Sequence, residues 1–180
     1  MKVVYSKRSF VSMVLESEYY TNMGKETGGV LLGQIRDNIY YVLESILPGF
    51  LAHHKSGSFK YDNDFVDYTA THLSSIYNVP LEVVGVWHTH INAPSVFSPA
   101  DQMLNEKFLT MSVDNRVLSV IITESSERMI NCFDVSKTGT QAINYKVDDS
   151  LIPYEFRQYK QIELMSICVH VKSVEKTMKK

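Results

Sequence analysis

Two consecutive apolar segments, residues 28–35 and 39–47, constrain the fold of this chain more than any other feature. They are separated by Asp37 and Asn38, residue types that readily form a tight turn, so the pair predicts a β-hairpin. Both segments are apolar at most positions rather than at alternate ones, which is typical of strands buried on both faces. The hairpin is therefore expected in the middle of a sheet.

Helical and strand patterns alternate along the rest of the chain. Helices are expected over three segments whose apolar residues recur at helical spacing, namely 7–23, 64–78 and 98–109. The first has an apolar face that includes Val11, Leu15 and Tyr19, and this face is expected to pack on the core. Further strands are expected near 59–61 and over 81–88, 116–123, 128–135 and 141–147. This order predicts one α/β (α+β) domain in which helices flank a mixed β-sheet.

The chain of 180 residues is long enough to form one core. Residues 1–150 are expected to form the domain, and residues 151–180 to be a C-terminal extension that packs on it or trails from it. Because 18 basic residues nearly balance 20 acidic ones, charge gives no reason to expect nucleic acid or a membrane as partner. No signal peptide or membrane-spanning run is recognisable, so a cytoplasmic location is expected.

Two histidines, His88 and His90, follow directly on a predicted apolar strand. Residues i and i+2 of a strand point to the same side, about 6.6–6.8 Å apart at the backbone, so the two imidazoles can converge on one metal ion. Thr89 between them is expected to face the other way. The pair alone is weak evidence for a metal site, because structural and surface histidines are commoner.

Asp101 lies at the expected start of a helix. Ser98 at the N-cap, Pro99 at the first helical position and an acidic residue two positions later form a good helix-start signal that needs no catalytic role. A helix N-terminus also fixes the position of a carboxylate, so Asp101 could complete a site of two histidines and one aspartate. The fourth position of a tetrahedral zinc would then be open to water, as in catalytic rather than structural zinc sites.

Such a site needs a proton acceptor beside the water that the metal activates. Glu26 is the candidate, because it lies at the junction between the first helix and the hairpin, ahead of two glycines that allow close backbone approach. Taken alone, one glutamate among the acidic residues of the chain would most often be a surface group.

Taken together, these residues resemble the signature of the JAMM metalloproteases, also called MPN+ or JAB-domain proteins. Glu26, the His-Thr-His segment 88–90, Ser98 and Asp101 occur in the order and at the spacing of that signature. The glycines after Glu26 and the apolar strand before the histidines also resemble the family. The similarity spans about residues 5–135, which is most of the chain.

The resemblance implies a single JAB/MPN-type domain with a curved mixed β-sheet flanked by helices. It implies zinc-dependent isopeptidase or peptidase activity at the C-terminus of a ubiquitin-like protein or its conjugate, in deconjugation or precursor processing. By the same resemblance, the Zn²⁺ ligands are His88, His90 and Asp101. Glu26 would be the general acid–base, and Ser98 would donate a hydrogen bond to the tetrahedral oxyanion.

The short chain and Trp87 before the first histidine look like bacterial members of the family. Some of these occur beside E1-like and E2-like conjugation enzymes in antiphage signalling, and such enzymes are therefore further expected partners. One departure is Ile91, because many members carry proline directly after the second histidine, whereas this chain delays its proline to Pro94. The path of the loop over the site is left open by this change.

Three alternative functions stay open at this point. The chain could be a metal-free MPN-type scaffold or binding module, or a zinc hydrolase that processes the tail of a sulfur-carrier protein. It could also hold non-haem iron, although Glu26 and Ser98 have no required role in that chemistry. The segment 48–58 is expected to be a loop with exposed His53 and His54, and contact of this loop with the substrate tail is its functional alternative.

Overall fold

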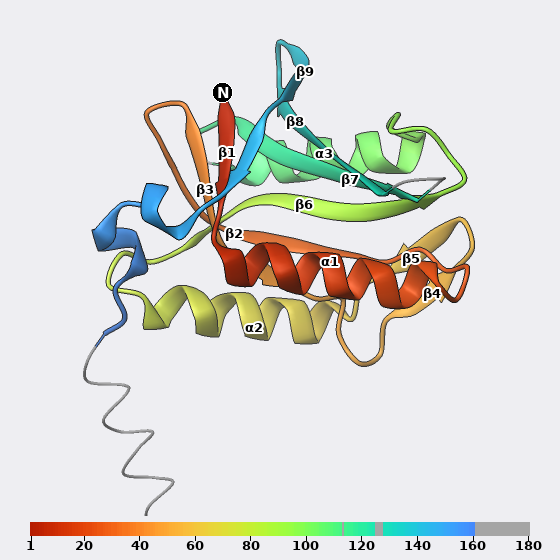
Figure 1. Cartoon of the computed structure of the whole chain (residues 1–180), viewed down its shortest axis with the longest axis horizontal. Coiled ribbons are helices and arrows are strands. Elements are labelled where there is room, and N and C mark those ends of the chain that lie inside the picture. Colours follow the sequence, from red (N-terminus) through yellow and green to blue (C-terminus); the bar gives the residue numbers. More distant parts are fainter. Residues whose placement is uncertain (113, 125–127, 161–180) are drawn as a thin grey trace, which may run out of the picture.

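The computed structural model describes residues 1–112, 114–124 and 128–160. Its main sheet contains β1 (Lys2–Tyr5), β2 (Gly28–Arg36), β3 (Ile39–Ile46), β6 (Glu82–Ile91), β7 (Arg116–Glu124), β8 (Arg128–Ser136), β9 (Gly139–Ile143) and β10 (Tyr145–Val147). The spatial order of these eight strands is β10-β1-β3-β2-β6-β7-β8-β9 (Figure 1). The described residues also form α1 (Lys7–Thr21), α2 (Asn63–Ile76) and α3 (Pro99–Met111). The predicted mixed sheet with flanking helices is confirmed.

The predicted hairpin is formed by β2 and β3, which pair in antiparallel fashion. Asp37 and Asn38 have φ angles of 53° and 60°, the left-handed conformations that a two-residue hairpin turn requires. β2 also pairs with β6, so the hairpin lies in the middle of the sheet as expected. β6 pairs with β7 on its other side, and the strand that carries both histidines is therefore held along both edges.

Helices cover both faces of the sheet (Figure 1). α1 covers one face, where Met13 belongs to the same buried cluster as Tyr5 and Trp87. α2 and α3 cover the other face, and their buried residues Val66 and Leu109 belong to two further clusters. Because side chains alternate along a strand, the neighbours of Trp87 in β6 point toward the face of α2 and α3.

The sheet is curved enough to bring its two edges together. β9 pairs with β8 at one edge and β10 pairs with β1 at the other, yet only Asn144 separates these two strands in the sequence. The Tyr40 hydroxyl of β3 donates to the Asp134 carboxylate of β8 at 2.6 Å, which joins two strands that are not neighbours in the sheet. The prediction of a single strand over 141–147 is wrong, because this segment contains the end of β9 at one edge of the sheet and all of β10 at the other edge.

α1 buries a different face from the one that its apolar residues predict. Val11, Leu15 and Tyr19 are 51%, 59% and 62% exposed, whereas Ser9 and Ser17 are buried on the sheet side together with Met13. Small side chains let the helix lie close to the strands, and the Ser9 hydroxyl donates to the carbonyl oxygen of Val42 in β3 at 3.2 Å. Packing distance, rather than hydrophobicity, selects the buried face of this helix.

A small second sheet occupies the second half of the segment that the sequence predicts to be a loop. β4 (His53–Lys55) and β5 (Ser58–Lys60) pair as an antiparallel hairpin, which we call the β4–β5 hairpin. The prediction of a loop over 48–58 is therefore wrong for its second half, and the strand expected near 59–61 is the second strand of this hairpin. In Figure 1 the hairpin lies beside the C-terminal end of α1.

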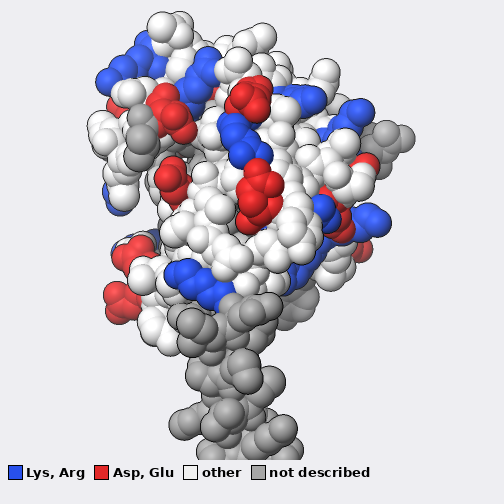
Figure 2. All heavy atoms as spheres, turned by 90° about the vertical axis from the view of Figure 1, so that its left-hand side faces the viewer, with Lys and Arg blue, Asp and Glu red and all other residues white. Residues whose placement is uncertain are grey.

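Part of the predicted C-terminal extension packs on the domain. Two short 3₁₀ helices, η1 (Asp149–Leu151) and η2 (Tyr154–Arg157), follow β10, and Ile152 and Phe156 near them are buried in the same cluster as Val66 of α2. Residues 161–180, the remainder of that extension, lie outside the described residues. On the side of the molecule shown in Figure 2, acidic and basic side chains are interspersed. None of the described helices has the length and hydropathy needed to cross a membrane.

Gly29→Ala should lower the free energy of unfolding by about 1–3 kcal/mol, as expected for overpacking of a filled core. A Cβ at Gly29 would overlap the carbonyl oxygen of Ile46 and the indole nitrogen of Trp87. Denaturant unfolding measures the effect, and Gly57→Ala is the control, because a Cβ at Gly57 has no neighbour within 4 Å. Equal midpoints for Gly29→Ala and the wild type would contradict the close packing described for β2.

Candidate metal centre

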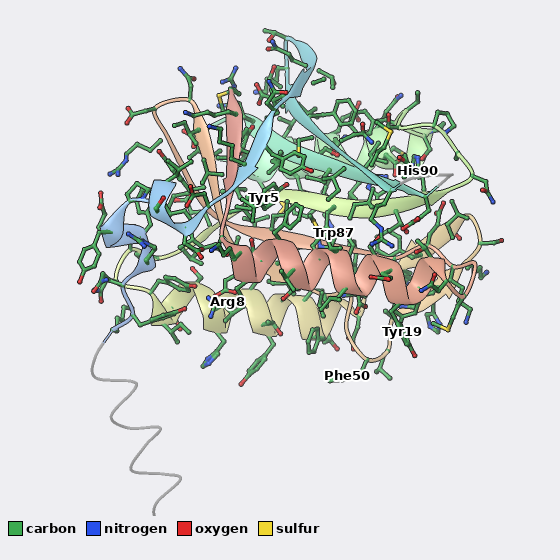
Figure 3. All side chains as sticks on the ribbon, in the orientation of Figure 1. Tyr5, Arg8, Tyr19, Phe50, Trp87 and His90 are labelled. Carbon is green, nitrogen blue, oxygen red and sulfur yellow. The ribbon has the colours of Figure 1, made fainter. Side chains whose placement is uncertain are left out.

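The end of β6 carries the two histidines. His88 and His90 are 4% and 9% exposed and point to the same side of the strand, as the alternation of side chains predicts. Thr89 faces the opposite side, where its N–H donates to the Thr27 carbonyl and its hydroxyl accepts from the Thr27 N–H, both at 2.8 Å. The residue between the histidines therefore ties β6 to the segment that contains Glu26. In Figure 3, His90 lies in the right-hand part of the molecule, far from Arg8 at the start of α1.

The start of α3 supplies the third residue. Ser98 is the N-cap, and its hydroxyl oxygen accepts from the Asp101 N–H at 3.2 Å. The Asp101 carboxylate accepts in return from the Ser98 N–H at 2.7 Å, which completes a capping box. The helix-start signal that explains these residues without catalysis is thus correct, and the same hydrogen bonds orient the carboxylate toward the histidines.

The three side chains lie close enough together to share one metal ion. The Nε2 atoms of His88 and His90 are 3.1 Å apart, and they lie 3.2 Å and 3.5 Å from the two carboxylate oxygens of Asp101. A tetrahedral zinc with bonds of about 2.0–2.1 Å has its ligand atoms about 3.3–3.4 Å apart. His88, His90 and Asp101 could therefore hold a metal ion without a large rearrangement.

A backbone carbonyl sets the orientation of one imidazole. Nδ1 of His90 lies 2.9 Å from the carbonyl oxygen of Pro94, which can only accept, so Nδ1 carries the proton and Nε2 is left as a ligand atom. This contact shows the path of the loop after Ile91: the chain turns at Asn92, which has a φ of 51°, and brings Pro94 back over His90. Pro94, which lies later in this chain than the proline of many family members, is thus part of the site.

The pKa values of two of the three side chains are shifted. Burial alone would raise the pKa of Asp101, but hydrogen bonds from His88 and His90 outweigh it and hold that pKa well below its usual range. The hydrogen bond to Asp101 raises the pKa of His90 above its ordinary value. Protons therefore compete with a metal ion for these ligand atoms.

Glu26 and Ser98 line the same cavity as the three candidate ligands, and this cavity has a volume of about 580 Å³. The remaining walls come from the β4–β5 hairpin, the loop after β6 and the start of α3. Burial raises the pKa of Glu26 above its ordinary value, although the nearby charge of His90 and a hydrogen bond from the Ile91 N–H lower it in part. All five residues singled out in the sequence are therefore brought together.

The β4–β5 hairpin is a part of the site that the sequence does not predict. Ser56, Ser58 and Phe59 line the cavity, and His54 contacts the backbone of Glu26. Tyr61, directly after the hairpin, places a buried hydroxyl with no hydrogen-bond partner among the described residues on the same cavity. The only sequence signal is a short alternation of polar and aromatic residues between serines and a glycine, which is equally typical of an exposed loop.

A curved mixed sheet, two histidines at the end of a central strand and an aspartate at a helix start together define a single-domain protein of the JAB type with a candidate metal group. A family model for prokaryotic homologs of the JAB domain matches residues 20–135, and the chain belongs to this family. The resemblance inferred from the sequence is thereby confirmed. The family includes zinc metalloproteases.

Among solved structures, the solution structure of a protein from Desulfitobacterium hafniense is similar to this chain, with a TM-score of 0.60. The two sequences are 15% identical, and the match covers 85% of this chain and 97% of that one. At this identity the likeness shows the fold alone. A search of curated protein sequences returned no match.

Proposed function

We propose that this chain is a zinc-dependent isopeptidase or peptidase that cleaves at the C-terminus of a ubiquitin-like protein or its conjugate. The observation that carries the proposal is the convergence of His88, His90 and Asp101: the two imidazole Nε2 atoms lie 3.1 Å apart, and each lies within 3.5 Å of a carboxylate oxygen of Asp101. Glu26 and Ser98 line the same cavity. Membership of the JAB family supports it. A scaffold that binds no metal has no need for this convergence of two imidazoles and a carboxylate.

In the proposed mechanism, His88, His90 and Asp101 would hold a zinc ion. A bound zinc ion supplies Lewis acidity, which lowers the pKa of water to about 7. Glu26 accepts a proton from the attacking water and delivers it to the leaving amine. Its partly buried position supports this role, because a carboxylate with a raised pKa is a stronger base than an exposed one.

Ser98 stabilises the negative charge that develops on the carbonyl oxygen of the substrate. Its hydroxyl oxygen already accepts from the Asp101 N–H, but its own proton is not used by that bond. The hydroxyl can therefore cap α3 and donate to the oxyanion at the same time. The two roles proposed for Ser98 do not compete.

The proposed substrate enters as an extended C-terminal tail between the β4–β5 hairpin and the loop after β6, both of which line the cavity. We propose the ubiquitin-like protein as substrate and E1-like and E2-like conjugation enzymes as further partners. We also propose a cytoplasmic location and a role in antiphage signalling.

The test combines metal analysis with a panel of ubiquitin-like and sulfur-carrier proteins, each bearing a fluorescent amine in amide linkage to its C-terminal carboxylate. We expect one zinc per chain and release of the fluorophore from at least one ubiquitin-like protein, with loss of activity on chelation and recovery with zinc. Cleavage of sulfur-carrier proteins alone would favour tail processing. Iron in place of zinc, or no metal and no cleavage, would contradict the proposal.

Ser98→Ala should keep zinc but turn over about 10²–10³-fold more slowly, as for removal of one oxyanion donor. Loss of the cap should also lower the free energy of unfolding by about 1 kcal/mol. Steady-state kinetics, zinc analysis and thermal unfolding on one preparation measure the three quantities.

Ser6→Ala is the matched control, because Ser6 caps α1 and accepts from the Ser9 N–H at 3.0 Å, outside the candidate metal centre. It should lose at least as much stability, because the Ser6 hydroxyl also donates to the carbonyl oxygen of Leu43 at 2.8 Å, and keep its turnover. If Ser98→Ala also turns over at the wild-type rate, Ser98 is a helix cap and nothing more.

A further inference from the structure

His54 is not the exposed loop residue that its sequence context suggests. It is half-buried in β4, and its ring stacks on Tyr20 of α1 with centroids 3.7 Å apart and an angle of 17° between the planes. Nδ1 of the same ring lies 2.9 Å from the backbone carbonyl oxygen of Glu26. The neighbouring His53 is exposed, so only one of the two adjacent histidines has partners of this kind.

The partner atom determines where the proton of His54 lies. A carbonyl oxygen only accepts hydrogen bonds, so Nδ1 must carry a proton and donate it. Burial lowers the pKa of His54, which favours the neutral ring with this single proton. Stacking on Tyr20 fixes the plane of the ring and therefore the direction of the N–H toward Glu26.

Both backbone polar groups of Glu26 are bound by β4. The Glu26 N–H donates to the carbonyl oxygen of Lys55 at 2.7 Å, and its carbonyl accepts from His54. Glu26 lies after the left-handed Gly24 that follows α1 and before β2, so the main sheet does not hold it through a strand ladder. The main sheet holds the next residue, Thr27, through Thr89, but the backbone of Glu26 itself is held by the β4–β5 hairpin.

The same hairpin contacts the ligand strand. The ring of Phe59 lies against Gly28, where a Cβ would overlap it, and Gly28 pairs directly with His88 across β2 and β6. Ser56 and Ser58 of the hairpin face the cavity. One small element thus contacts the proposed base, the strand partner of a candidate ligand and the cavity where substrate would lie.

We propose that His54 is a positioning residue: by donating Nδ1–H to the Glu26 carbonyl, it fixes the glutamate at the distance from the metal group that proton transfer requires. The role rests on the proposed function of Glu26 as general base. His54 itself contacts neither the metal ligands nor the reacting atoms. Its effect on catalysis should pass entirely through Glu26.

Three variants separate positioning from simple packing. His54→Ala removes both the donor and the stacked ring. His54→Asn also removes the ring, but its side-chain amide branches from Cγ as Nδ1 does and can donate to the same carbonyl. His53→Ala is the matched control on the exposed neighbouring position of the same strand.

We expect kcat of His54→Ala to fall by about 10-fold to 10²-fold, as for a displaced catalytic group, with zinc content unchanged and KM little changed. His54→Asn should recover most of the lost kcat while having the same lowered melting temperature as His54→Ala, because both lack the stacked ring. His53→Ala should resemble the wild type in every measurement. Equal kcat for His54→Ala and His54→Asn, or a rise in KM alone, would overturn the proposal.

A double-mutant cycle tests whether the effect passes through Glu26. In a Glu26→Gln background, His54→Ala should cause no further loss of kcat, because two residues that act as one unit are not additive. An additive loss would show that His54 acts by another route and would overturn the proposal.

An NMR measurement tests the hydrogen bond between His54 and the Glu26 carbonyl independently of activity. The carbonyl carbon shift of Glu26 should change in His54→Ala and remain near the wild-type value in His54→Asn, with or without zinc. Exchange of the Glu26 amide proton should be faster only in His54→Ala. If no tested substrate is cleaved but these shifts are found, the proposed function fails and the contact stands; if cleavage occurs but the shifts are unaffected, the positioning role fails alone.

Discussion

His88→Ala, His90→Ala and Asp101→Ala should each lose bound zinc and all measurable cleavage. The reason is geometric: only these three side chains converge on one point among the described residues, and removal of one leaves two protein ligands, too few for the site. In the wild type, added zinc should also raise the melting temperature, because it binds only the folded state. The three variants should show no such rise.

Metal analysis, thermal unfolding with and without zinc, and a cleavage assay provide the three measurements for these variants. His72→Ala is the control for loss of a histidine, because His72 is exposed on α2 and does not line the cavity. It should keep zinc and activity. If a variant of His88, His90 or Asp101 retains both full zinc content and full activity, the substituted residue is not a zinc ligand.

Glu26→Gln should keep zinc and lose about 10²–10⁴-fold in kcat, the usual contribution of general acid–base catalysis. Glutamine has the size and reach of glutamate but accepts no proton from the attacking water and delivers none to the leaving amine. Zinc is retained because Glu26 is not among the three residues that form the metal group. Substrate affinity should change little, so the variant should capture its conjugate intact and identify the natural substrate.

Zinc stoichiometry, conjugate binding and turnover are measured on one preparation of Glu26→Gln. Glu82→Gln is the control, because Glu82 is an exposed carboxylate at the other end of β6. Near-normal turnover of zinc-loaded Glu26→Gln would mean that another group is the base, and the mechanism would have to be abandoned.

The parts of the fold and site that follow local rules could be predicted from the sequence. Asp37 and Asn38 predict the hairpin because few other residues adopt two successive left-handed conformations. His88 and His90 point to one side because alternation is a property of every strand. Ser98 and Asp101 lie where a capping box places them. Each of these inferences depends on neighbours within a few residues along the chain.

The features of the fold and site that could not be predicted from the sequence depend on contacts between residues far apart in the chain. Leu15 and Tyr19 are apolar and regularly spaced, yet α1 turns its serines inward because close approach to β3 requires small side chains. β9 and β10, on either side of Asn144, can lie at opposite edges of the sheet only because the whole sheet curves. The contact of His54 with Glu26 joins residues 28 positions apart, and no local pattern marks it.

The pairing of β6 on both edges limits how the length of this chain can vary during evolution. His88 is aligned with Gly28 on one side and with Ile121 on the other. Insertion or deletion of one residue between Gly85 and His88, where the pairing is regular on both edges, would turn both histidines toward α1 and bring Thr89 to the cavity, because each step of one residue reverses every side chain. Length changes can be absorbed at exposed turns such as the one at Thr138, or where the register of β6 with β2 already shifts opposite Leu31 and Leu32, but not between Gly85 and His90.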